Sequence, residues 1–147
     1  MHAQNIMLNL LTRDSGVVKT GAVVFLEVTI HNTSPAVALP MYKLRPQISF
    51  PSGMVQIPDE GHVLPKGWII HINKEGVVTL GNGTDMIPEN SSRTILIAIR
   101  GVNKGGPATI NGNLNFSNGI APGKMNGPAP KEDKSVDNFS TSSVKVI

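Results

Sequence analysis

Apolar and polar residues alternate along the stretch from residue 20 to residue 34, where the sequence reads TGAVVFLEVTIHNTS. The even positions of its centre are apolar: Val24, Leu26, Val28 and Ile30. The other face carries the polar side chains of Glu27, Thr29 and His31. A period of two places each set on its own face of a strand. The segment therefore predicts a central strand with one buried face and one solvated face. Other strands of the protein must cover the buried face.

The same period recurs in other parts of the chain. Long alternating segments are 5–12, 91–101, 108–117 and 138–147. Short strands are expected at 47–50 and 54–57, and the apolar runs 67–72 and 77–80 are joined by Asn73-Lys74-Glu75-Gly76, a hairpin pattern. Residues 91–101 are apolar on both faces, so this strand is expected to be central. Residues 17–20 are expected to lead into the central strand.

Proline and loop residues divide these segments. Pro40 and Pro46 lack backbone N–H groups, so the stretch that contains them is predicted to be an edge strand or a loop. Three polar stretches, 58–66, 81–90 and 119–137, are expected to be loops, the last of them long and flexible. No segment shows a convincing helical period. Seven to nine strands with turns about every ten residues predict an all-β fold, an antiparallel two-sheet β-sandwich.

Composition agrees with this picture and narrows the classes of function. The 147 residues suit a single domain, 1–147, and aromatic residues make up only 4%, so Val, Ile and Leu must fill the core. The net charge of +3 comes from scattered Lys and Arg residues, not from a basic stripe, which argues against nucleic acid as a partner. No apolar run reaches the roughly 20 residues needed to cross a bilayer, so no direct membrane insertion is expected.

The absence of cysteine fits a cytosolic protein or an exported bacterial protein that is stable without disulfides. The start Met1-His2-Ala3-Gln4 reads like an added methionine before the residues that follow a removed export signal.

The ordered motifs resemble a known family, the immunoglobulin-like DUF11 repeat of bacterial cell-surface proteins and its CARDB relatives. The motifs that carry the resemblance are the strand ending in Ile30-His31-Asn32-Thr33-Ser34-Pro35, Pro51-Ser52-Gly53-Met54, Gly67-Trp68, Pro88-Glu89-Asn90-Ser91, and Asp137-Asn138-Phe139-Ser140 with Val144. Each motif is weak alone, and their order over nearly the whole chain is what identifies the family. The resemblance implies an immunoglobulin-like sandwich that serves as a secreted or cell-surface module.

Candidate metal, cofactor and catalytic residues are weak in the sequence. The four histidines, His2, His31, His62 and His71, include no H-x-H pair, and no cysteine assists them. Acidic residues of the loops include Asp14, Asp59 and Asp85 but form no D-x-D-x-D run, although a calcium site assembled between loops stays open. No G-x-S-x-G elbow and no phosphate-binding loop is present. The sequence therefore predicts no enzyme, no metal and no cofactor.

Surface loops remain as candidate contact sites. The residues expected to make contacts there are Asp59, Glu60, His62, Asn82, Asp85, Lys124 and Lys131. Trp68 could stack on a sugar, but its alternation with Ile70 and Ile72 favours a core position. Related stalk domains suggest a Lys–Asn isopeptide bond, for which Lys19, Asn138 and Glu27 are conceivable partners.

Two functions are compatible with these patterns. The first is a non-enzymatic structural or adhesive module of a secreted or cell-surface bacterial protein, acting as a spacer between neighbouring domains or presenting them. The second is a binding module whose long loops recognise a glycan or a host or cell-surface protein.

Overall fold

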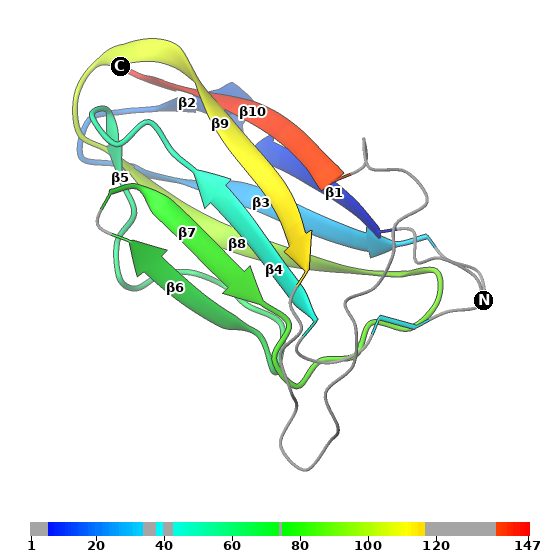
Figure 1. Cartoon of the computed structure of the whole chain (residues 1–147). Coiled ribbons are helices and arrows are strands. Elements are labelled where there is room, and N and C mark those ends of the chain that lie inside the picture. Colours follow the sequence, from blue (N-terminus) through cyan, green and yellow to red (C-terminus); the bar gives the residue numbers. More distant parts are fainter. Residues whose placement is uncertain (1–5, 34–37, 40–42, 74, 117–137) are drawn as a thin grey trace.

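The computed structural model describes residues 6–33, 38–39, 43–73, 75–116 and 138–147 and contains ten strands in two layers (Figure 1). The strands are β1 (Ile6–Thr12), β2 (Val17–Val18), β3 (Val23–Asn32), β4 (Leu44–Ser49), β5 (Val55–Gln56), β6 (Ile69–Asn73), β7 (Val77–Gly81), β8 (Ser91–Gly101), β9 (Gly105–Phe116) and β10 (Phe139–Val146). One sheet has the order β1-β3-β8-β5 and the other β2-β10-β9-β4-β7-β6. The predicted all-β two-sheet sandwich is confirmed, with slightly more strands than expected.

The four-stranded sheet is built around β3, as the alternation predicts. All four even positions from Val24 to Ile30 are buried, and β3 pairs with β1 on one side and β8 on the other. β8 is interior as expected, and its Ile95, Ile97 and Ile99 are fully buried. The core between the sheets therefore consists mainly of aliphatic side chains.

The prediction for Pro46 was wrong. Pro46 lies in β4, which is an interior strand between β9 and β7. Pro46 is paired with Leu114 of β9, but the pairing with β7 begins only at Gln47 and Thr79. The missing N–H therefore removes no bond from the β4–β7 ladder, and an interior strand tolerates the proline.

Residues 17–20 also differ from expectation. Val17 and Val18 form β2, which pairs in parallel with Lys145 and Val146 of β10 in the six-stranded sheet. The chain then crosses to the other sheet before β3 begins. A two-residue strand has too short a pattern to show which sheet it joins. The predicted loop at 119–137 lies outside the described residues.

One lateral edge of the sandwich is closed by side chains. β1 is the edge of its sheet, and its Leu10 and Thr12 N–H groups donate to the hydroxyls of Ser140 (3.0 Å) and Ser142 (3.1 Å) on β10. Gly112 of β9 faces β1, and a Cβ added there would lie 2.9 Å from Leu10 Cδ1. The two sheets approach closely here because glycine leaves room and serine supplies acceptors.

Candidate functional site

The predicted contact residues fall into separate parts of the fold. Residues 58–66 run beside β8, where Val63 and Leu96 exchange both backbone hydrogen bonds at 2.9 Å. Residues 81–90 follow β7 and contact the start of β6. Lys124 and Lys131 lie outside the described residues. The two described loops therefore bond to different parts of the sandwich, and the third candidate loop lies outside the described residues.

His62 holds its own loop against the sheet. Its Nδ1 accepts the N–H of Ala98 (3.0 Å), so its Nε2 is the donor to the carbonyl of Pro58 (2.6 Å). Both ring nitrogens are therefore engaged inside the protein. This loop partly extends the short fourth strand of the sheet, because it continues along β8 the pairing that β5 begins at Gly101. The loop covers Ala98, which is buried on the outer face of β8.

Asn82 and Asp85 belong to a polar cluster at the start of β6. Asn82 is fully buried; its Oδ1 accepts the N–H of Leu44 (3.1 Å) and its Nδ2 donates to the carbonyl of Asp85 (2.8 Å). The Asp85 carboxylate accepts the indole N–H of Trp68 (2.7 Å) and the Nε of Arg93 (2.8 Å). These bonds join the loop to β4, to Trp68 immediately before β6, and to β8. Trp68 is buried as predicted, with its polar edge on a carboxylate.

Asp59 and Glu60 are exposed and border a hollow of about 600 Å³ on the outer face of the four-stranded sheet. Phe25 and Arg100 line the other side of this hollow. It combines one aromatic side chain with charges of both signs. Of the predicted contact residues within the described part of the chain, these two carboxylates are the ones directed at an open surface.

A second hollow, which was not predicted from the sequence, opens at the edge of the sandwich opposite β1. Its volume is about 650 Å³, and its apolar lining comes from Val55, Ile57, Ile72 and Val102. It lies between the two sheets, where β5 on one side and β6 on the other are edge strands. No sequence signal marks it, because its lining residues come from separate segments of the chain.

Within the described residues, no three His, Asp or Glu side chains gather as a metal site would require.

The predicted isopeptide pair of Lys19 and Asn138 is wrong. Lys19 follows Val18, which pairs with Val146, whereas Asn138 precedes the other end of β10. Eight strand residues separate the two ends, about 25 Å. A search of the described part for a helix long and apolar enough to cross a membrane found none.

Solved structures of other proteins share the fold of this chain. No protein-family model and no curated protein matches the sequence. Among solved structures, the CARDB domain of a Pyrococcus furiosus protein, determined in complex with di-metal ions, has a TM-score of 0.59 and 10% identity, covering 99% of this chain and 96% of that one. The chain has the fold of a CARDB domain.

A cohesin module from a Clostridium perfringens family 33 glycoside hydrolase has a TM-score of 0.57 and 10% identity, covering 99% of this chain and 98% of that one. A chain of a Clostridium thermocellum type I cohesin–dockerin complex has a TM-score of 0.55 and 9% identity, with coverages of 97% and 99%. The predicted immunoglobulin-like sandwich is thus confirmed, and so is its resemblance in fold to CARDB domains. At such low identity the likeness concerns the fold, and the DUF11 relationship stays a prediction.

Proposed function

We propose that this CARDB-like chain is a non-enzymatic structural or adhesive module, a single domain over residues 1–147, of a secreted or cell-surface bacterial protein. Its role is to space or present neighbouring domains. The observation that carries the proposal is the use of its loop residues: Asn82, Asp85 and His62 all form internal hydrogen bonds that fasten loops to strands. Polar groups used in this way stiffen a sandwich and give it a fixed length.

The fold supports the same role. Solved structures that share it include a cohesin module of a glycoside hydrolase and BcpA, the major pilin subunit of Bacillus cereus. The BcpA match has a TM-score of 0.55 and covers 97% of this chain but 40% of the pilin. A sandwich of this size thus occurs as one part of a longer protein, which is what a spacer module requires.

The first test is the size of the native polypeptide. An antibody raised against the 147-residue chain is used to capture the protein from cells and from medium, and the captured chain is sized under denaturing conditions. A chain several times longer, recovered from the surface fraction or from the medium, is the expected result. A native product of this size alone, or one confined to the cytosol, would contradict the spacer role.

A binding module is the second candidate, with a glycan or a protein of the host or cell surface as its ligand. It is favoured by the hollow beside Asp59 and Glu60, which is also lined by the aromatic side chain of Phe25 and the positively charged Arg100. A glycan array and a surface-protein screen with the wild-type chain, repeated with Asp59→Ala and Phe25→Ala, test it. Binding that is lost in both variants would support this candidate, and binding that neither variant changes would exclude this hollow.

A further inference from the structure

The edge strand β6 differs from the other edges of the described sheets. β2 and β5 have only two residues each, and the edge of β1 is covered by serine hydroxyls from β10. β6 has five residues, Ile69-Ile70-His71-Ile72-Asn73, paired in unbroken register with β7. It contains no Lys, Pro or bulge, the devices that normally prevent an edge strand from pairing with another chain. Ile69 is 52% exposed.

The outward backbone groups of β6 belong to Ile70 and Ile72. Gly76 donates its N–H to the carbonyl of Asn73 (3.1 Å), and Asn73 pairs with Val77 to close the hairpin. In an antiparallel ladder alternate residues bond to the same neighbour. Because Asn73 bonds to β7, so do His71 and Ile69. The N–H and C=O groups of Ile70 and Ile72 therefore point away from β7, toward the free edge.

The pattern of β6 is symmetric about His71. We propose that β6 is a self-association edge, at which a second copy of this chain pairs antiparallel about a two-fold axis at His71. Ile70 then exchanges both hydrogen bonds with Ile72 of the second copy, and the reciprocal pair forms by symmetry. The two outward-pointing residues thus meet each other, as an isologous interface requires. His71 meets its own copy in the close, non-hydrogen-bonded pair.

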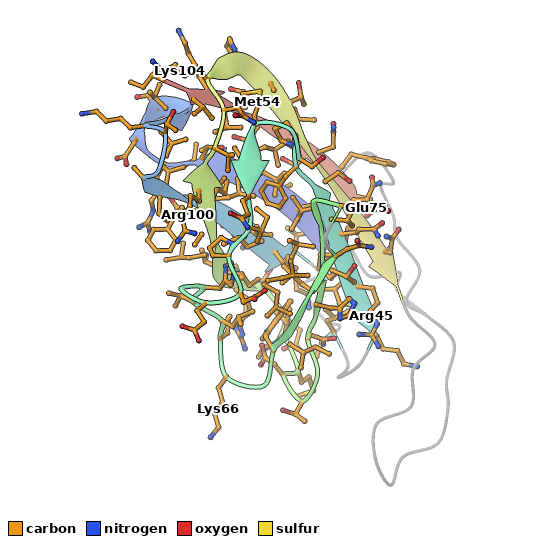
Figure 2. All side chains as sticks on the ribbon, turned by 90° about the vertical axis from the view of Figure 1, so that its left-hand side faces the viewer. Arg45, Met54, Lys66, Glu75, Arg100 and Lys104 are labelled. Carbon is orange, nitrogen blue, oxygen red and sulfur yellow. The ribbon has the colours of Figure 1, made fainter. Side chains whose placement is uncertain are left out.

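Charges at the two ends of β6 suit this pairing. Lys66 precedes β6 and Glu75 follows it, both are exposed, and Figure 2 shows them well apart on the side of the molecule that carries this edge. Antiparallel pairing about His71 places the end of β6 that carries Glu75 beside the end of the second copy's β6 that carries Lys66. Two such opposite-charge contacts form by symmetry, and β6 itself has no Lys, Arg, Asp or Glu. Lys74, beside Glu75 in the sequence, lies outside the described residues.

The inward side chains of β6 face the hollow at this edge, whose lining is partly apolar. Ile72 lines the hollow with Val55, Ile57 and Val102, and it is half-buried, as is Ile70. In the proposed register Ile70 of the second copy lies directly beside Ile72, on the same face of the joined sheet. Pairing therefore covers apolar surface at the mouth of both sandwiches while it satisfies the edge backbone.

The absence of cysteine allows a test of both partner and register. The full chain carrying His71→Cys is incubated with oxidised glutathione, which is reduced as two thiols join. In the proposed pair the two Cα atoms lie about 4.5 Å apart, within disulfide range. The matched control is Ile69→Cys on the same face of the same strand. In the proposed pair the two introduced cysteines at position 69 would be offset along the strands by four residues, about 13 Å, and could not form a disulfide.

A covalent species of twice the 15.6 kDa chain mass, formed rapidly by His71→Cys and at least tenfold more slowly by Ile69→Cys, is the expected result. Equal cross-linking of the two variants would overturn the register. Sedimentation of the wild-type chain up to submillimolar concentration must also show a dimer. His71→Lys should weaken it about tenfold, because like charges would face each other. Gln47→Lys, two strands away in the same row, should not.

A wild-type chain that stays monomeric at all concentrations would overturn the proposal. If its β6 amide protons then gain protection from exchange only when another protein is added, the edge belongs to a different partner. The inference goes beyond the proposed function and can fail separately from it. Sedimentation and cross-linking decide the dimer, whereas the size of the native polypeptide decides the spacer role.

Discussion

The two lateral edges of the sandwich meet the same difficulty in different ways. An edge strand leaves alternate N–H and C=O groups without a ladder partner. At the β1 edge the opposite sheet solves this, because Ser140 and Ser142 occur two residues apart on β10 and accept from Leu10 and Thr12, which have the same spacing. At the β6 edge the facing strand β5 has only two residues and covers no such row.

The contrast shows what closing a sandwich requires. One sheet must supply acceptors at the two-residue period of the other sheet's edge, and a small residue must let the layers approach, as Gly112 does near Leu10. Near β6 the hydrogen-bonded polar cluster of Asp85 lies at the start of the strand, while the strand itself contains no Lys, Arg, Asp or Glu. At the β1 edge the backbone N–H groups of Leu10 and Thr12 are bonded within the chain, whereas the β6 edge is the one that we propose pairs with a second copy.

The largest effect is expected from removing the polar cluster at the start of β6. Asp85→Ala leaves the indole N–H of the buried Trp68 and the guanidinium of Arg93 without their acceptor. We expect the free energy of unfolding to fall by about 3 kcal/mol in urea titrations. Asp85→Asn, which keeps an oxygen acceptor, should lose about 1 kcal/mol.

Asp59→Ala is the matched control for this prediction, because Asp59 is an exposed loop carboxylate. Its effect should stay within about 0.5 kcal/mol. Equal losses for Asp59→Ala and Asp85→Ala would mean that the cluster does not fasten β6.

A side chain at Gly112 should force the closed edge apart. A Cβ there would lie 2.9 Å from Leu10 Cδ1 and 3.0 Å from Leu8 Cδ2, both buried between the sheets. Because of this overpacking, we expect Gly112→Val to lower the free energy of unfolding by about 2 kcal/mol in the same urea titrations. Gly53→Ala is the control, because its Cβ would meet nothing within 4 Å. A neutral Gly112→Val would show that the layers are not tightly packed there.

The serine hydroxyls of β10 should contribute less to the free energy of unfolding, and their loss should also change hydrogen exchange at the amides that they accept from. Ser142→Ala removes the acceptor of the Thr12 N–H and the partner of the Thr12 hydroxyl, 2.7 Å away. We expect a loss of about 1 kcal/mol and faster hydrogen exchange at the Thr12 amide. Ser143→Ala, on the exposed face of the same strand, should change neither quantity. Unchanged exchange at Thr12 in Ser142→Ala would disprove the hydroxyl closure.

These features differ in how far the sequence could predict them. Alternation is local, so the buried face of β3 and the two-sided burial of β8 could be predicted from consecutive residues. The placement of Pro46 in an interior strand depends on where the β7 ladder begins, which no local pattern contains. Asn82 and Asp85 were predicted as contact residues because both are polar loop residues. Their partners Leu44, Trp68 and Arg93 come from three other segments, so their internal bonds required the fold.

The smallest effect concerns the ion pair beside the closed edge. Arg13 follows β1 and pairs with Glu27 of β3 at 3.2 Å, but the two side chains are 45% and 29% exposed, against 27% and 14% for Arg93 and Asp85. Water and salt screen such an exposed pair, and ordering two long side chains costs entropy. A double-mutant cycle of Arg13→Ala and Glu27→Ala should therefore give a coupling below about 0.5 kcal/mol, decreasing with added salt. Coupling as strong as that between Arg93 and Asp85 would show that the closed edge depends on charge as well as on hydroxyl groups.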